Sequence, residues 1–297
     1  MSGKGIHSIG IGDPGAVDTK YVSLIQDLKP EQIRMNEPLQ NHTTFKIGGP
    51  ADLFIRPASG ADMQHIAEQC QKRRIDYLVI GNGSNLLFSD RGYRGVVIQI
   101  LSNMSHVRVC PADDYPDNCP DNHPDDRPDR KIISEAGVTL AALAAAAYEA
   151  GLTGLEFASG IPGALGGGIA MNAGAYGGEM RDVFLEAEIL LDGQIRTLAR
   201  DEMAFAYRSS ALQVNNGVLL SASLKLKTGA RPAIKAQMDT LNARRREKQP
   251  LEWPSAGSAF KRPEGYFAGK LIMDSGLRGF SIGGAQVSEK HCGFIIN

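Results

Sequence analysis

Glycine is concentrated in short stretches of this chain rather than spread evenly. The densest stretch is 159–168, in which five of the ten residues are glycine. Two others are Gly81-Asn82-Gly83-Ser84-Asn85 and Asn172-Ala173-Gly174-Ala175-Tyr176-Gly177. A backbone that lacks side chains lets a flat ligand or a diphosphate approach closely. Three such loops therefore predict a fold with two lobes that hold a large dinucleotide between them.

The loop 81–85 follows a short buried-strand pattern at 77–80. Its backbone N–H groups can converge on an anion, most often a phosphate. The third glycine of the fingerprint Gly-x-Gly-x-x-Gly is missing, and a plain tight turn is the alternative. The glycine loops by themselves do not separate FAD from NAD or from a nucleotide sugar.

Composition and charge exclude several classes of protein. The chain has 297 residues, 42% hydrophobic and 22% charged, which is ordinary for a globular protein of two or three domains. The formal net charge of −1 favours neither nucleic acid nor an anionic membrane. No apolar run approaches the roughly 18 residues of a membrane span, and the N-terminus lacks a signal-peptide pattern. We therefore expect a cytoplasmic protein that binds neither nucleic acid nor membranes.

The four cysteines, Cys70, Cys110, Cys119 and Cys292, are scattered without metal-ligand spacing. We expect reduced thiols and no bound metal. The stretch 111–130 is rich in Pro and Asp and is interpreted as a solvated loop inserted between two strands. An acidic metal site there is the less favoured alternative, because the prolines keep the carboxylates extended.

Periodicity divides the chain into an N-terminal tail with a short helix, over 1–38, and three further domains. These are a first lobe at 39–100, a second lobe at 101–228 that carries the acidic loop, and a third unit at 229–297. The expected helices are 21–28, 61–74, 139–150, 231–248 and 267–275, and the expected strands are 51–56, 77–80, 95–100, 131–136, 186–191, 195–198, 218–226 and 293–296.

Capping and turn residues support three of these elements. Thr139 is expected to cap the alanine-rich helix, and Gly151 is expected to end it. Asp192-Gly193 predicts the turn of a hairpin. Pro250 predicts the end of the long helix that precedes it.

Two polar motifs follow the glycine loops. The first is Tyr207-Arg208-Ser209-Ser210, and the second is Ser255-Ala256-Gly257-Ser258-Ala259-Phe260 followed by Lys261-Arg262-Pro263. From the residues alone, a surface ion pair for the arginine and a turn-forming role for the serine are the alternatives. In this order and together with the glycine loops, the motifs resemble the UDP-N-acetylenolpyruvoylglucosamine reductases, from about Leu39 to Asn297.

The resemblance implies an α+β protein with a two-lobed FAD-binding fold of the PCMH type, as in vanillyl-alcohol-oxidase-like flavoproteins. A small α/β C-terminal substrate-binding domain completes it. The resemblance implies an oxidoreductase, a UDP-N-acetylmuramate dehydrogenase, that uses NADPH and FAD in peptidoglycan synthesis and thus in cell-wall biogenesis, cell shape and division. The short connection between Tyr207 and Ser258 is similar to that of the shorter subclass of the family.

The same resemblance implies which residues bind FAD. His42 lies outside the glycine motifs, so non-covalent FAD is expected. The residues implied to bind the FAD pyrophosphate are Gly81, Asn82, Gly83, Ser84 and Asn85. The residues implied to lie beside the flavin or to complete its site are Gly160, Ile161, Gly163, Gly167, Asn172, Gly174, Ala175 and Tyr176.

The resemblance also implies the catalytic roles. Arg208 would bind the enolpyruvyl carboxylate of UDP-N-acetylglucosamine enolpyruvate and stabilise the charge that develops on it. Ser258 would donate the proton that completes UDP-N-acetylmuramate. Tyr207, Lys248 and Gln286 are the candidate substrate contacts. From charge alone, the basic helix end that carries Lys248 could equally be a solvated face.

The resemblance has a limit at the C-terminus. Family members carry a further helix and a Leu-Glu-Pro-Glu-like segment whose glutamate acts with the arginine and serine, whereas this sequence stops at Asn297. We expect the third catalytic residue to be absent and turnover to be impaired, with FAD binding retained. The alternative function is a catalytically impaired flavin-binding remnant. The Tyr-Arg and Ser-Ala-Gly-Ser motifs argue against a third class, a flavin oxidase.

Overall fold

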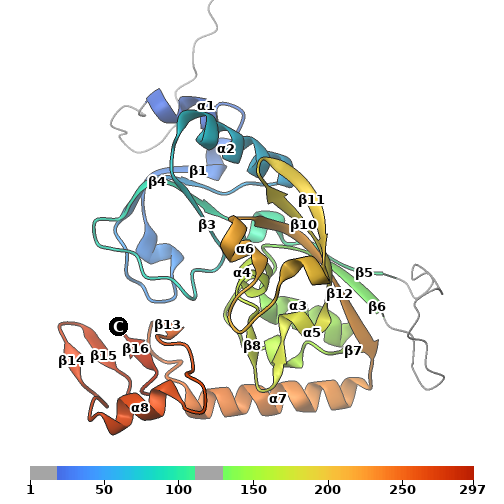
Figure 1. The fold of residues 1–297 in the computed structure, drawn as a ribbon, viewed down its shortest axis with the longest axis vertical. Coiled ribbons are helices and arrows are strands. Elements are labelled where there is room, and N and C mark those ends of the chain that lie inside the picture. Colours follow the sequence, from blue (N-terminus) through green and yellow to red (C-terminus); the bar gives the residue numbers. More distant parts are fainter. Residues whose placement is uncertain (1–18, 111–129) are drawn as a thin grey trace, which may run out of the picture.

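The computed structural model describes residues 19–110 and 130–297, and Figure 1 shows them as two lobes and a third unit. The tail residues 1–18 and the acidic stretch 111–129 lie outside the described residues, and so do the expectations made for them and for Cys119. The long helix α7 (Arg231–Lys248), orange in Figure 1, runs along the second lobe and leads to the third unit, drawn in red.

The first lobe is a four-stranded sheet in the order β1–β2–β4–β3. Its strands are β1 (Ile33–Pro38), β2 (Pro50–Ile55), β3 (Tyr77–Ile80) and β4 (Tyr93–Gln99). β2, β4 and β3 run parallel, because helix α2 (Gly60–Arg73) returns the chain between β2 and β3. The Ser59 side chain caps α2 by accepting a hydrogen bond from Asp62 N, and α1 (Val22–Ile25) packs beside α2.

The sequence pattern places 33–38 in the N-terminal tail, and the structure corrects this. Ile33 pairs with Ile55 and Met35 pairs with Leu53, so β1 is the antiparallel edge of the first sheet. Asn36 has a φ of 52°, which leaves it out of the pairing register. Only two apolar residues precede this interruption, too few for the alternation that identifies a strand.

The second lobe is an antiparallel sheet in the order β11–β10–β12–β6–β5, with β7 paired to the end of β12. The strands are β5 (Val107–Val109), β6 (Arg130–Glu135), β7 (Leu152–Thr153), β10 (Phe184–Leu191), β11 (Gln194–Ala199) and β12 (Val218–Thr228), with a small ribbon of β8 (Gly174–Ala175) and β9 (Gly178–Glu179). The helices are α3 (Leu140–Glu149), α4 (Leu165–Ala170), α5 (Met180–Val183) and α6 (Ala211–Asn215). As expected, Thr139 caps α3 by accepting from Ala142 N, and Asp192-Gly193 turns the β10–β11 hairpin.

The two lobes share one apolar core. Leu53 and Ile66 of the first lobe and Ile132, Leu143 and Leu224 of the second belong to the same cluster of buried side chains. Removing this apolar surface from water is the main stabilising contribution to folding. The shared core holds the lobes together, so the loops at their junction keep a fixed separation.

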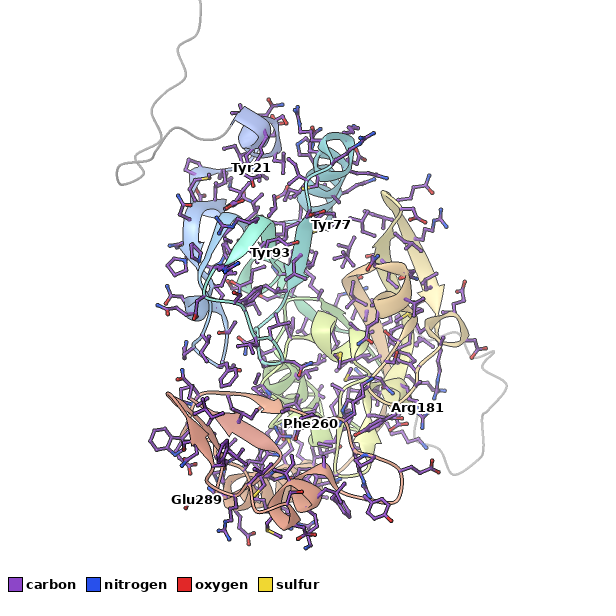
Figure 2. All side chains as sticks on the ribbon, turned by 60° about the vertical axis from the view of Figure 1, so that its left-hand side comes forward. Tyr21, Tyr77, Tyr93, Arg181, Phe260 and Glu289 are labelled. Atoms are coloured by element: carbon purple, nitrogen blue, oxygen red, sulfur yellow. The ribbon has the colours of Figure 1, made fainter. Side chains whose placement is uncertain are left out.

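The third unit is an antiparallel sheet in the order β13–β16–β15–β14, with one helix, α8 (Ala268–Asp274). Its strands are β13 (Ser255–Ser258), β14 (Ser281–Ile282), β15 (Ala285–Val287) and β16 (Phe294–Ile296). Figure 2 labels Phe260 and Glu289 on this unit, at the opposite end of the molecule from Tyr21. Within residues 19–110 and 130–297 its sheet pairs with neither lobe, and hydrogen bonds with loop residues join it to them.

Candidate functional site

Two of the glycine loops lie against each other at the junction of the lobes. Asn82 Nδ2 donates to Pro162 O at 2.7 Å, and an added Cβ at Gly81 would lie 3.1 Å from Ala164 Cβ. The loop after β3 in the first lobe therefore touches the loop that leads into α4 in the second. These loops are 80 residues apart in sequence, and the structure joins them into one surface.

Gly83 is a glycine because the protein backbone requires one. Its φ is +62°, and an added Cβ would overlap His42 O and lie 2.9 Å from Thr43 Cα. The segment around His42 is itself fixed, because the imidazole stacks on Phe54 at 4.1 Å and its Nε2 lies 2.7 Å from Glu37 Oε1. His42 is outside the glycine motifs in sequence but beside the 81–85 loop in space.

Gly167 and Gly163 leave room for a ligand instead. An added Cβ at Gly167 would meet no protein atom within 4 Å, and at Gly163 the nearest atom would be 3.6 Å away. A bare, exposed backbone at this position fits the close approach of an extended cofactor with a flat ring and a diphosphate. The residues present therefore fit a bound dinucleotide.

The third glycine stretch begins with an inward-facing asparagine. Asn172 has no exposed surface, and its φ is +41°. Its Nδ2 donates to Ala206 O at 3.1 Å, and its Oδ1 accepts from Arg181 N at 3.0 Å. Both ends of this side chain are occupied within the protein, so any contact of Asn172 with a cofactor falls to its main chain. Gly174 and Ala175 form β8, and Tyr176 is 44% exposed.

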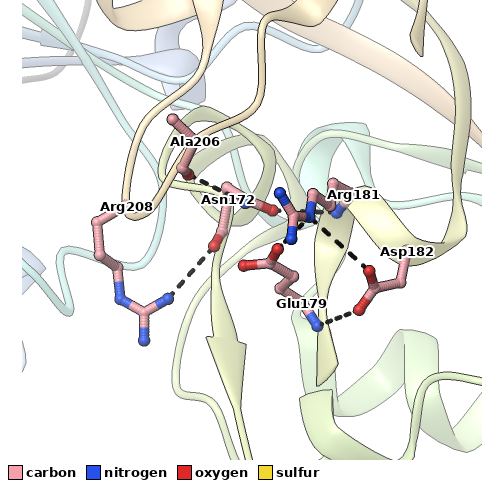
Figure 3. Close-up of polar contacts among 6 residues, drawn as sticks. All are labelled: Asn172, Glu179, Arg181, Asp182, Ala206 and Arg208. Carbon is pink, nitrogen blue, oxygen red and sulfur yellow. Dashed lines mark hydrogen bonds and ion pairs between the residues drawn. The ribbon is translucent and has the colours of Figure 1, made fainter. Parts of the chain in front are cut away.

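Arg208 lies beside this stretch, as Figure 3 shows. Its Nη2 donates to Gly174 O at 2.7 Å and its Nη1 to Asn172 O at 3.3 Å. The guanidinium carbon is 5.1 Å from the centre of the Tyr207 ring. The side chain is thus not paired with a carboxylate in the described part of the chain, and it retains its charge for a ligand.

Tyr207 and Thr44 connect the lobes to the third unit. Arg262 N donates to the Tyr207 hydroxyl at 3.2 Å, and Thr44 Oγ1 donates to Ser255 O at 2.7 Å. Ser255 begins β13, and Ser258 ends it with its side chain exposed. The first of these bonds joins the segment after β13 to the second lobe, which carries Arg208, and the second joins β13 to the first lobe.

The two remaining candidate substrate residues differ in their surroundings. Lys248 is exposed at the last position of α7. Gln286 lies in β15, and its Nε2 donates to Gly279 O at 3.1 Å, so the amide nitrogen already has a partner within the unit. Among the described residues, no cluster of three or more His, Cys, Asp or Glu side chains has the arrangement of a metal site.

Sequence reasoning missed Arg245. Its guanidinium donates to Gly160 O, and burial lowers the pKa of Arg245 against an opposing contribution from Tyr176. The signal was present, because Ile234, Met238 and Arg245 follow helical spacing and share the less exposed face of α7. Arg245 therefore joins α7 to the glycine loop at 159–168.

Comparison with known proteins identifies the family. A model described as FAD binding domain matches residues 51–199, and the C-terminal domain model of UDP-N-acetylenolpyruvoylglucosamine reductase matches residues 249–297. The UDP-N-acetylenolpyruvoylglucosamine reductase of Agathobacter rectalis is 50% identical over 283 residues, which cover 93% of this chain and 86% of that relative. The chain belongs to the UDP-N-acetylenolpyruvoylglucosamine reductase family. As a member of this family, it is an FAD-binding oxidoreductase.

Solved structures confirm the predicted fold. The UDP-N-acetylenolpyruvylglucosamine reductase of Thermus caldophilus superposes with a TM-score of 0.73 at 32% identity, covering 89% of this chain and 88% of that structure. A grass pollen allergen with glucose dehydrogenase activity, Phl p 4, shares the fold over 71% of this chain and 44% of its own, at a TM-score of 0.53 and 14% identity. The two-lobed FAD-binding fold is thus shared beyond the reductase family.

The comparisons do not favour the alternative function, a flavin-binding remnant. Relatives named as reductases align with this chain over 91–93% of its length in the most similar cases, and the C-terminal domain model reaches residue 297. Among the described residues, none of the helices is both long and apolar enough to cross a membrane. The domain limits and the roles of individual site residues remain predictions.

Proposed function

We propose that this chain is a cytoplasmic enzyme that reduces UDP-N-acetylglucosamine enolpyruvate to UDP-N-acetylmuramate with NADPH, in peptidoglycan precursor synthesis. The observation that carries the proposal is the position of Arg208. Its guanidinium is bonded to Asn172 O and Gly174 O, next to the glycine loops, and carries no carboxylate partner among the described residues. A cation held at that place suits the carboxylate of an enolpyruvyl group.

Non-covalently bound FAD would be held by the loop 81–85 at its pyrophosphate and by the backbone of Gly160, Ile161, Gly163 and Gly167 beside the ring. The stretch 174–176 would complete the pocket. When bound, FAD supplies the transfer of a hydride from NADPH to the terminal vinyl carbon of the substrate. The bare surface at Gly167 supports this assignment, because no protein atom lies within 4 Å of the place where its side chain would project.

Arg208 and Ser258 would do the remaining chemistry. Hydride addition to the vinyl group moves negative charge to the neighbouring carbon and its carboxylate, where the Arg208 cation stabilises it. The Ser258 hydroxyl then donates its proton to that carbon, so a hydride and a proton together saturate the double bond. Ser258 is exposed on a strand bonded to the first lobe, and the segment that follows is bonded to the second, which supports its access to a ligand between them.

Tyr207 and Lys248 would contact the sugar nucleotide, Lys248 through the diphosphate. Gln286 would do so through its carbonyl oxygen or its second amide N–H, because the first already donates to Gly279 O. These roles divide the site between the second lobe, which carries the arginine, and the third unit, which carries the serine.

An anaerobic stopped-flow experiment tests the proposal. The purified protein, loaded with FAD, is mixed with NADPH and then with UDP-N-acetylglucosamine enolpyruvate while flavin absorbance is followed. Loss of the oxidised flavin band and its recovery with substrate are expected. Ser258→Ala should keep the first phase and slow the second by about 10²–10⁴-fold. Ser281→Ala, an exposed serine of the same unit, is the control.

Two results would contradict the proposal. If NADPH reduces the flavin and the enolpyruvyl sugar nucleotide does not reoxidise it, the substrate is wrong. If the protein takes up no FAD, the cofactor assignment is wrong. Repeating the first phase with NADH measures the preference between the two nicotinamide cofactors.

A further inference from the structure

Arg208 stands at the tip of a very tight turn. Ala206 N donates to Ser209 O at 3.1 Å and Ser209 N donates to Ala206 O at 3.2 Å, so only Tyr207 and Arg208 lie between the paired residues. Arg208 has a φ of 55°, a left-handed conformation that is uncommon for residues other than glycine. Such a conformation persists only when the surrounding structure fixes it.

Asn172 supplies the side-chain contact to the base of this turn. Its Nδ2 donates to Ala206 O, the carbonyl at the base of the turn, at 3.1 Å. Its main-chain oxygen accepts from Arg208 Nη1 at 3.3 Å. One residue thus holds both the backbone that carries Arg208 and the guanidinium at the end of its side chain, and Figure 3 shows both bonds.

Asn172 is itself fixed from the opposite side. Its Oδ1 accepts from Arg181 N at 3.0 Å, at the start of α5. That helix start is closed by Glu179 N, which donates to Asp182 Oδ2 at 2.9 Å, while the Arg181 side chain pairs with Glu179. The Asn172 side chain has no exposed surface, so its amide orientation is set by these protein partners.

We propose that Asn172 is a positioning residue for Arg208 in the substrate half of the reaction. The inference rests on the proposed function and deepens it, because it assigns to Asn172 a role other than direct cofactor binding. The Asn172 amide holds the turn, and the turn aims the Arg208 guanidinium at the substrate carboxylate. Flavin reduction by NADPH needs no such cation at that place, so the two half-reactions should respond differently.

Asn172→Asp tests the amide donor with almost no change of shape. The carboxylate can still accept from Arg181 N, but it places an oxygen where Nδ2 donated to Ala206 O. We expect the FAD content and the flavin reduction by NADPH to stay within two-fold of the unsubstituted protein. Flavin reoxidation by UDP-N-acetylglucosamine enolpyruvate should slow at least ten-fold. Because a protonated aspartic acid can donate again, this rate should partly recover as pH falls, relative to the unsubstituted protein.

The control is Asn216→Asp. Asn216 also has a left-handed φ, 55°, and it lies exposed at the end of α6. The same substitution there should change neither half-reaction. A second variant, Asn172→Gly, removes the side chain, and glycine readily adopts the φ of +41° found at this position. If the aspartate variant does not fold, this variant still measures the loss of the amide donor. It should show the same slow reoxidation without the recovery at low pH.

A double-mutant cycle separates positioning from general damage. If Asn172 acts through Arg208, then adding Asn172→Asp to Arg208→Met should slow reoxidation no further. Additive losses, equal losses in both half-reactions, or normal reoxidation in both Asn172 variants would overturn the inference. If even the unsubstituted protein is not reoxidised by the enolpyruvyl sugar nucleotide, the proposed function fails instead, and the inference fails with it.

Discussion

Gly83→Ala should destabilise the protein through one identifiable contact. The added Cβ would overlap His42 O, lie 2.9 Å from Thr43 Cα and take a φ of +62°. The left-handed conformation costs about 1–2 kcal/mol for a residue with a Cβ. Overpacking against backbone that cannot rotate away adds about 1–3 kcal/mol. The free energy of unfolding should therefore fall by about 2–5 kcal/mol in total.

Gly193→Ala is the matched control, because it separates these two contributions. Gly193 has a φ of +76° in the β10–β11 turn, and an added Cβ there would meet nothing within 4 Å. It should cost only the conformational part, about 1–2 kcal/mol. Urea unfolding of the FAD-free protein, followed by far-UV circular dichroism, measures both variants. If Gly83→Ala costs no more than Gly193→Ala, the contact with His42 does not constrain the loop.

Three further predictions concern groups that lie around the site or in the core. Thr44→Val removes the bond to Ser255 O, so flavin reoxidation by the substrate should slow about five-fold while the affinity for FAD is unchanged. Thr44→Ser keeps the hydroxyl and should restore the rate. Equal rates in all three proteins would exclude a role for this bond. Burial raises the pKa of Cys70 to about 12, so iodoacetamide at pH 8 should modify this thiol in the unfolded protein only. Peptide mass spectrometry would detect the modification, and labelling of Cys70 in the folded protein would contradict the prediction. A hydrogen bond from Lys131 lowers the pKa of Glu186, so the stabilisation is present above the unfolded pKa and is lost as pH falls through the folded one. Glu186→Gln should therefore lower the urea midpoint at pH 7, and this effect should shrink as pH falls through the folded pKa. An effect of equal size at neutral and acidic pH would refute the assignment.

The elements with strong local signals were predictable from the sequence. Helix α7 has the predicted bounds of 231–248, because its apolar positions keep helical spacing and Pro250 follows its end. The hairpin turn was readable from Asp192-Gly193, since both residues have positive φ, which this pair tolerates. The shared core was not predicted, because periodicity does not show which lobes pack together.

The short strands were not predictable. β13 to β15 are two to four residues long and contain Ser, Gly and Gln, so no alternation distinguishes them from loops. The same limit applies to the candidate site. The sequence grouped Asn172 with the glycines around it, but only the structure shows that its side chain faces Ala206 and Arg181. It named Lys248 as the contact from the basic helix end, and only the structure shows that Arg245 of the same helix faces the glycine loop.

Three hydrogen bonds between side chain and main chain join the third unit to the lobes. Thr44 bonds Ser255, Tyr207 bonds Arg262, and Asn297 Nδ2 bonds Phe45 O at 3.1 Å. Each such bond contributes only about 1 kcal/mol net. Breaking these three bonds is therefore inexpensive compared with opening the shared core. If movement of this unit admits substrate and releases product, the turnover rate should decrease in proportion as solvent viscosity increases. Such a dependence is expected when domain movement, rather than the chemical step, is rate-limiting.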